Sequence, residues 1–132
     1  MTRYYLDTSV AVHVLEGDVT AMQWFDAATA DADVVSSRLL QTELTRVLRR
    51  ERRQVLDREA LLDHVGLVPI SDSILTAAES ITEHVKTLDA IHLATALRLG
   101  SATVLVSHDQ TLLRVAAELG IRGSDPLEEP SS

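Results

Sequence analysis

Four carboxylate side chains stand at positions from which they could share one site: Asp7, Glu43, Asp89 and Asp109. Carboxylates gathered in one cleft repel one another, and their pKa values rise unless a cation is present. Hard oxygen ligands, with no thiolate or histidine among them, suit Mg²⁺ or Mn²⁺. Such an ion can lower the pKa of a water and neutralise charge on a phosphoryl oxygen. Taken together, the four acids indicate a metal site suited to hydrolysis at phosphate.

Each acid also has a purely structural interpretation. Asp7 and Asp109 could be helix caps, and Asp89 could complement a helix dipole. Glu43 falls at the edge of the apolar stripe of its helix, and a partly buried carboxylate there needs a partner. Arg46, one turn further on, is the partner that this interpretation predicts.

Apolar runs typical of strands alternate along the chain with stretches of helical periodicity. This alternation predicts a three-layer α/β domain with a mainly parallel central sheet flanked by helices. The run at 102–107 is continuously apolar, as expected of a strand covered on both faces. The expected strands are 3–7, 32–37, 67–70, 102–107 and a short last one at 121–124, and the expected helices are 10–17, 18–30, 38–53, 57–65, 71–84, 88–99 and 109–119.

These elements bring the four acids toward one edge of the sheet. Ligands of a parallel sheet bind in the crevice beyond the carboxyl ends of its strands. Asp7 closes the first strand, and Asp109 follows the strand 102–107 by two residues. Glu43 and Asp89 lie in the first two turns of their helices, which again places them near the ends of strands.

Length and composition limit the number of domains and the class of protein. The chain has 132 residues, of which 45% are hydrophobic and 24% charged. These values predict one globular domain over residues 1–132, with a frayed tail at about 125–132. The absence of cysteine excludes disulfide frameworks, thiolate zinc sites and cysteine nucleophiles. No run resembles a signal peptide or approaches the roughly 18 apolar residues of a membrane span, so we expect a cytoplasmic protein without a membrane partner.

The net charge of −8 argues against a simple polyanion binder, but the positive charge is unevenly spread. On the helix 38–53, Arg46, Arg50 and Arg53 fall within about 80° of Glu43. They could form a basic stripe that holds phosphates beside a metal site. Alternatively, they form a solvated helix end that the helix dipole favours.

The order and spacing of four segments resemble a known family. The runs YYLDTSV, TEL around Glu43, LDAIHLATAL and VLVSHDQTLL are similar to the PIN-domain nucleases, and more closely to the VapC toxins of bacterial VapBC toxin–antitoxin pairs. The resemblance spans about residues 3–123. It implies a metal-dependent endoribonuclease with a PIN-like fold, a homodimer, an RNA substrate and an inhibitory VapB-type antitoxin.

The resemblance also implies roles for particular residues. The catalytic and metal-binding quartet of the family corresponds to Asp7, Glu43, Asp89 and Asp109, with Mg²⁺ or Mn²⁺ as cofactor. Ser9 and Ser107 occupy positions that support the carboxylates and water in the family. Many relatives carry a further acid just after the last aspartate, whereas this chain has Gln-Thr-Leu-Leu over 110–113. One metal ion is therefore the expectation.

The histidines and three other classes of function give alternative interpretations. The five histidines, His13, His64, His84, His92 and His108, share no metal-ligand spacing and are typical of core or solvated positions, although His92 lies one turn after Asp89. A receiver domain needs a lysine after a late strand, and a haloacid-dehalogenase-like phosphatase needs a second aspartate where Ser9 stands, so both fail. The alternative that stays open is an inactive PIN domain serving as a protein- or RNA-binding module.

Overall fold

Five strands form one sheet in which every neighbouring pair runs parallel, in the order β3-β2-β1-β4-β5. The computed structural model describes residues 2–128. The strands are β1 (Arg3–Leu6), β2 (Asp33–Ser37), β3 (Gly66–Val68), β4 (Thr103–Val106) and β5 (Arg122–Ser124). The predicted parallel α/β sheet is confirmed, including the short last strand, which pairs with β4.

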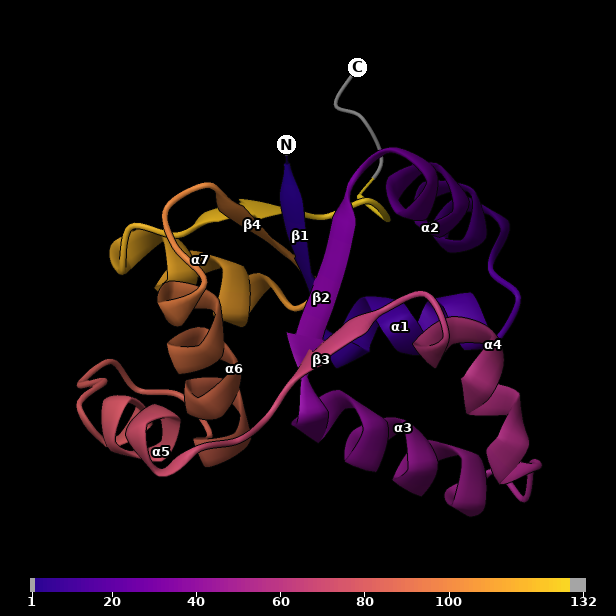
Figure 1. The fold of residues 1–132 in the computed structure, drawn as a ribbon, viewed down its shortest axis with the longest axis horizontal. Coiled ribbons are helices and arrows are strands. Elements are labelled where there is room, and N and C mark those ends of the chain that lie inside the picture. Colours follow the sequence, from indigo (N-terminus) through magenta and orange to yellow (C-terminus); the bar gives the residue numbers. More distant parts are fainter. Residues whose placement is uncertain (1, 129–132) are drawn as a thin grey trace.

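Helices cover the sheet in two groups, as Figure 1 shows. The helices are α1 (Thr8–Leu15), α2 (Val19–Asp31), α3 (Arg38–Arg50), the 3-10 helix η1 (Val55–Arg58), α4 (Glu59–Leu62), α5 (Asp72–Glu79), α6 (Thr87–Arg98) and α7 (Gln110–Glu118). Helices α1 to α4 lie on one side of the strands, and α5 to α7 lie on the other (Figure 1). No helix within residues 2–128 is long and apolar enough to cross a membrane.

The two layers have separate apolar cores because successive side chains of a strand face opposite sides of the sheet. Leu6 and Val106 pack into the core under α1 to α4, whereas Tyr5 and Leu105 pack into the core under α6 and α7. All four side chains are fully buried. The central strands β1 and β4 are therefore held from both faces, which fixes the residues that follow them.

Helix α3 ends earlier than predicted. It stops at Arg50 rather than at residue 53, since Arg52 takes a left-handed backbone conformation with φ of 57°. The Arg53 N–H then turns back to the carbonyl of Leu48 at 2.9 Å. This geometry satisfies a free carbonyl at the helix end and stops the helix.

The predicted helix over 57–65 is a 3-10 turn followed by one turn of α-helix. Leu61 and Val65 are buried as predicted. The segment ends in turns in which the Val65 N–H donates to the Leu62 carbonyl and the His64 N–H donates to the Leu61 carbonyl, both at 3.1 Å. Gly66 does not end a helix as predicted. It opens β3, an edge strand that stops before Pro69.

Helix α5 also ends short of the predicted position, at Glu79 rather than near His84. The Ser80 hydroxyl donates to the Thr76 carbonyl at 3.2 Å, and Ile81 leaves the helical path to pack against the apolar cores. A β-branched residue is a weak helix former, and Ile81 packs, partly buried, just beyond the end of the helix.

Asp125, the first residue of the predicted frayed tail, forms side-chain hydrogen bonds with the rest of the fold. The Asp125 Oδ2 atom accepts hydrogen bonds from His108 Nδ1 at 2.9 Å and Gln110 Nε2 at 2.8 Å. The backbone N–H of Leu127 donates to Asp125 Oδ1 at 2.9 Å. Asp125 is therefore docked on the loop that follows β4, while the last part of the predicted tail, 129–132, lies outside the described residues.

Candidate active site

The strand order reverses between β1 and β4, because β2 and β3 continue on one side of β1 and β5 lies beyond β4. Such a switch point opens a crevice at the carboxyl ends of the two strands. Leu6 and Val106, the last residues of β1 and β4, are directly paired. Asp7 and the segment 107–109 follow these ends, so the sheet brings Asp7 and Asp109 to one crevice, as predicted.

Asp7 is almost completely buried, with 5% of its surface exposed, and it caps helix α1. Its Oδ2 atom accepts hydrogen bonds from Ser9 Oγ at 2.7 Å and Ser107 Oγ at 2.9 Å. A weaker bond at 3.4 Å comes from the Ser9 N–H. A buried carboxylate needs such donors. The cap interpretation of Asp7 is thus confirmed, and it coexists with a place at the crevice.

The two serine hydroxyls extend from Asp7 to the loop after β4. Ser9 Oγ accepts from the His108 N–H at 2.9 Å, and Ser107 Oγ accepts from the Asp109 N–H at 3.0 Å. Each hydroxyl therefore donates to Asp7 and accepts from a backbone N–H of the loop that follows β4. This network holds the backbone of Asp109 at a fixed position relative to the carboxylate of Asp7.

Asp109 caps helix α7, since its Oδ1 atom accepts from the Leu112 N–H at 3.1 Å. The structural interpretation of this residue is therefore also confirmed. The cap uses one carboxylate oxygen, and no hydrogen bond within residues 2–128 reaches the other. Capping and a role in the crevice do not compete for the same atom.

Glu43 reaches the crevice from helix α3. Its Oε1 atom accepts from Thr8 Oγ1 at 2.7 Å and bonds to His92 Nε2 at 2.6 Å. The predicted partner Arg46 is wrong: its side chain is exposed and forms no ion pair with Glu43 in the described part of the chain. The contact between α3 and α6 supplies the partner instead of the next turn of the same helix.

His92 is a buried link between Glu43 and the centre of the sheet. Its ring is 1% exposed, and its Nδ1 atom lies 2.6 Å from the phenolic oxygen of Tyr5. Burial by itself would lower the pKa of His92, but the hydrogen bond to Glu43 and the charges of Asp7, Glu43 and Asp89 outweigh it and raise the pKa. Burial raises the pKa of Tyr5 far above its usual value, so the phenol is neutral.

Asp89 stands in the first turn of α6 and is half-buried. Burial and the nearby negative charges of Asp7 and Asp109 raise its pKa, while the positive charges of His92 and Lys86 act in the opposite direction. A carboxylate that senses two others is the electrostatic signature of a shared acidic site. The electrostatics therefore connect Asp89 to the two strand ends.

The donor set fits a hard divalent cation in its chemistry. Asp7, Glu43 and Asp109 each use one carboxylate oxygen for the hydrogen bonds above, and no bond from residues 2–128 reaches the second oxygen or either oxygen of Asp89. Free carboxylate oxygens that repel one another are the ligands that Mg²⁺ and Mn²⁺ prefer. Within residues 2–128, however, no three acidic or histidine side chains are gathered as closely as a bound metal ion requires.

A hollow of about 400 Å³ opens beside two of the acids. Asp89 and Asp109 line it together with His84, Lys86 and Thr111. The wall thus combines two carboxylates with the single lysine of the chain. Lys86 thus places a positive charge beside two carboxylates that would repel a negatively charged ligand.

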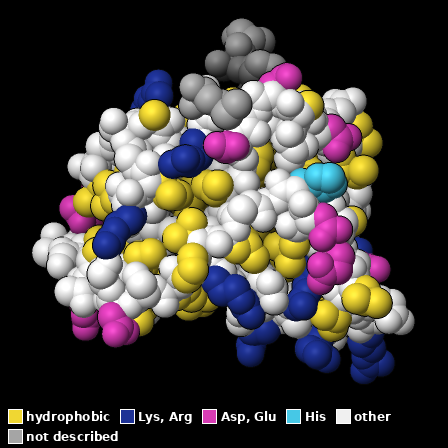
Figure 2. Space-filling view, viewed as in Figure 1, with side chains coloured by type: hydrophobic (Ala, Val, Ile, Leu, Met, Phe, Trp, Pro, Cys, Tyr) yellow, Lys and Arg dark blue, Asp and Glu magenta, His cyan; other side chains and the backbone are white. Residues whose placement is uncertain are grey.

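The predicted arginine stripe is only partly a free surface. Figure 2 shows dark-blue side chains gathered along the lower edge of the molecule, over α3 and its end. Arg46 and Arg50 are exposed. Arg53 instead donates to the carbonyl of Leu15 at 3.2 Å and lies 3.6 Å from Asp57. Arg53 therefore joins two parts of the fold, and the structure leaves Arg46 and Arg50 as the exposed members.

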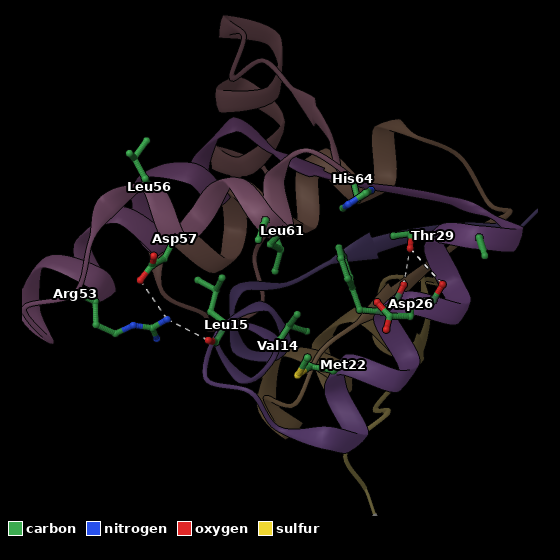
Figure 3. A pocket seen from close by; sticks show the side chains of 13 residues that line it. Val14, Leu15, Met22, Asp26, Thr29, Arg53, Leu56, Asp57, Leu61 and His64 are labelled. Carbon is green, nitrogen blue, oxygen red and sulfur yellow. Dashed lines mark hydrogen bonds and ion pairs between the residues drawn. The ribbon is translucent and has the colours of Figure 1, made fainter.

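A second, larger groove of about 750 Å³ contains none of the four acids. Figure 3 shows its wall, which α1, α2, η1 and α4 supply. Leu15, Leu61 and Phe25 line it, and Met22 and Leu56 stand at 42% and 76% exposure. Large exposed apolar side chains around a groove are typical of a protein-interaction surface.

The fold and the crevice together define an α/β domain with acidic side chains at the switch point of a parallel sheet. The family model of the PIN domain matches residues 4–118. Ribonuclease VapC35 of Mycobacterium tuberculosis, from strains H37Rv and CDC 1551, is 34% identical over 128 residues, which covers 89% of this chain and 92% of that protein. The chain belongs to the PIN domain family, as its four sequence segments predict.

Solved structures share the fold at lower identity. VapBC2 from Rickettsia felis, bound to a DNA fragment from its promoter, matches with a TM-score of 0.77 at 10% identity, over 94% of this chain and 98% of that chain. A toxin–antitoxin complex from Klebsiella pneumoniae matches with a TM-score of 0.76 at 21% identity, over 96% and 99%. These likenesses confirm the predicted PIN-like architecture.

Sequence reasoning missed three polar residues of the crevice: Tyr5, Thr8 and the role of His92. The spacing of Asp89 and His92 did hold a signal, because residues three apart share a helix face. Thr8 and Tyr5 gave none, since their partners lie far away in sequence, 35 and 87 residues on. Only the packing of α3 against α1 and of α6 against β1 reveals them.

Proposed function

We propose that this protein is an endoribonuclease that acts as the toxin of a type II toxin–antitoxin pair. The observation that carries the proposal is the crevice itself. Ser107 Oγ bonds to both the Asp7 carboxylate and the Asp109 backbone N–H, and the charges of Asp7 and Asp109 raise the pKa of Asp89. The similarity to a ribonuclease of Mycobacterium tuberculosis supports RNA as the substrate.

Asp7, Glu43, Asp89 and Asp109 would hold one Mg²⁺ or Mn²⁺ ion. When bound, such an ion would lower the pKa of a water molecule and neutralise charge on a phosphate oxygen. The chain's own residues orient the carboxylates: Ser9 and Ser107 hold Asp7, while Thr8 and His92 hold Glu43. Each carboxylate keeps one oxygen that these bonds do not use. The proposed reaction is hydrolysis of one phosphodiester bond of RNA, which leaves two shorter RNA fragments.

RNA needs positive charge to approach an acidic molecule. We assign this role to Arg46 and Arg50 on the exposed side of α3 and to Lys86 in the hollow beside Asp89. Cationic side chains that contact phosphates provide affinity without reading the base sequence. Arg53 is a weaker candidate, because its guanidinium is already bonded to Leu15 and faces Asp57.

An antitoxin of the VapB type is the proposed protein partner, and the apolar groove of Figure 3 is its proposed contact. The groove exposes Met22 and Leu56, which a partner segment could bury. If so, Leu56→Glu weakens antitoxin binding at least about tenfold, as for loss of an apolar anchor, and leaves RNA cleavage unchanged. Equal binding by wild type and variant would reject this groove. A homodimer and a cytoplasmic location stay predictions.

A PIN domain that only binds RNA or protein is the second candidate. It is favoured by one observation, the absence within residues 2–128 of a ligand group already gathered for a metal. Cleavage of an RNA mixture separates the two candidates. With Mg²⁺ or Mn²⁺, the wild type should produce discrete new RNA ends, and Asp89→Asn, purified identically, should lower the rate at least about 100-fold. RNA binding without any cleavage by the wild type would favour the binding module.

A further inference from the structure

A chain of polar side chains joins β1, which ends just before Asp7, to α6 and α3, which carry Asp89 and Glu43. Tyr5 lies on β1 two residues before Asp7, His92 lies on α6 three residues after Asp89, and Glu43 lies on α3. The phenolic oxygen of Tyr5 is 2.6 Å from His92 Nδ1, and His92 Nε2 is 2.6 Å from Glu43 Oε1. Tyr5 is fully buried and His92 is 1% exposed, so bulk water does not compete for these bonds.

The chain delivers a donor to Glu43 in either charge state of the imidazole. If His92 is neutral, the phenol of Tyr5 donates to Nδ1, which leaves the proton on Nε2 to face the carboxylate. If His92 is protonated, both ring nitrogens donate, and the phenolic oxygen accepts. Positioning of Glu43 therefore does not depend on a change of protonation.

Thr8 completes the hold on the same oxygen. Its hydroxyl donates to Glu43 Oε1 at 2.7 Å, from the residue that follows Asp7. Two donors on one oxygen fix the carboxylate and leave Oε2, which no hydrogen bond from residues 2–128 reaches. A hydrogen bond to one oxygen of a metal-binding carboxylate orients the other toward the metal.

We propose that His92, held by Tyr5, and Thr8 are positioning residues that present the second carboxylate oxygen of Glu43 to the cation of the crevice. This inference rests on the proposed function. An ordinary buried histidine that only fills the core predicts the same burial, but it assigns no importance to which ring nitrogen is kept. The two interpretations therefore differ for substitutions that preserve one nitrogen position and not the other.

The test is Mn²⁺ affinity, measured by isothermal titration calorimetry and by loss of the free-ion electron paramagnetic resonance signal. His92→Gln places an amide donor where Nε2 stands, whereas His92→Asn reaches only the position of Nδ1. We expect His92→Gln to keep the Mn²⁺ Kd within about threefold, and His92→Asn to weaken it at least about tenfold, as for loss of a residue that orients a metal ligand. If the two variants bind Mn²⁺ with equal affinity while the wild type still binds it, the positioning role is overturned and the proposed function is not.

A second pair protects the test against a variant that fails to fold. Thr8 lies near the surface, and Thr8→Ser keeps the hydroxyl while Thr8→Val removes it at nearly constant volume. Thr8→Val should weaken Mn²⁺ binding at least about fivefold and Thr8→Ser less than about threefold, on the same scale. If Ser and Val bind Mn²⁺ equally, the positioning role is rejected. If the wild type binds no Mn²⁺, the metal-dependent function falls together with the inference.

Discussion

Asp7 and Asp109 show how one side chain serves both a helix and a crevice. Each gives one carboxylate oxygen to a helix N-terminus or its serines and keeps the other. From sequence alone, capping and ligation look like competing interpretations. They are compatible because a carboxylate has two oxygens and a cap uses only one.

Asp89 is the acid for which removal of charge should stabilise the metal-free fold. Its pKa is raised by burial and by Asp7 and Asp109, so folding favours its protonated form. The folded state is therefore penalised at any pH above the raised pKa, and the penalty disappears as pH falls through that pKa toward the value in the unfolded chain. Asp89→Asn should raise the melting temperature in EDTA at pH 7 and lose this advantage near pH 3.

The measurement is a melting curve of both proteins across pH, first in EDTA and then with Mn²⁺. Added Mn²⁺ should stabilise the wild type more than the variant, because a ligand stabilises the state that binds it. A lower melting temperature of Asp89→Asn in EDTA at pH 7 would contradict the repulsion.

At the scale of elements, strand ends are more predictable than helix contacts. The runs before Asp7 and Asp109 predict their position at a sheet edge, since parallel strands present the same ends together. Glu43 is different: its helix is predictable, but its partner His92 is 49 residues away and depends on how α3 packs beside α6. Periodicity describes one helix face and says nothing of the neighbour, so it predicts Arg46 instead.

Some helix ends are predictable from sequence and others are not. Gly17 and Gly120, which take positive φ after α1 and α7, are signals that sequence shows directly. Arg52 also takes a positive φ, and nothing in its residue type announces this. The end of α5 coincides with the packing of the partly buried Ile81 against the cores, which is a tertiary contact.

Helix α3 gives a prediction on RNA binding. Arg46 and Arg50 are exposed on the side of Glu43, and each contact with a single-stranded phosphate contributes about 0.7 to the slope of log affinity against log salt. In an Asp89→Asn background that prevents cleavage, Arg46→Gln with Arg50→Gln should weaken RNA binding and flatten the slope by about 1.4.

The matched control for the α3 experiment removes the same charge elsewhere. Arg49 is exposed on the same helix about 120° from Glu43, and Arg114 is exposed on α7. Arg49→Gln with Arg114→Gln should leave the slope nearly unchanged. An identical change of slope in the two double variants would assign the effect to net charge rather than to the stripe.

For the whole molecule, we expect the C-terminal segment to contribute to stability through Asp125 rather than through the residues after it. Asp125 accepts from His108 and Gln110, whereas the backbone N–H groups of Leu127 and Glu128 donate back to Asp125 itself. Deleting 126–132 should lower the melting temperature by less than about 5 °C, which corresponds to about 1 kcal/mol for a domain of this size. Deleting 125–132 should lower it more, because two side-chain donors lose their acceptor. Equal melting temperatures of the two truncations, measured by scanning calorimetry, would show that Asp125 contributes nothing.

The whole molecule is acidic, with a net charge of −8, yet it is proposed to act on a polyanion. A divalent cation in the crevice resolves this conflict locally, because it reverses the sign of the field where the phosphate must lie. The exposed arginines of α3 and the single lysine add positive charge at the margin. The proposed activity therefore depends most on whether the four acids work through a metal ion.

The most direct test is the rate of RNA cleavage as a function of free divalent ion. We expect no cleavage in EDTA, recovery when excess Mg²⁺ or Mn²⁺ is restored, and a rate at least about 100-fold lower for Asp7→Asn at saturating ion. Asn keeps the cap of α1, so circular dichroism should show the variant folded. Cleavage that continues undiminished in EDTA, or an Asp7→Asn variant that is folded and fully active, would contradict the account.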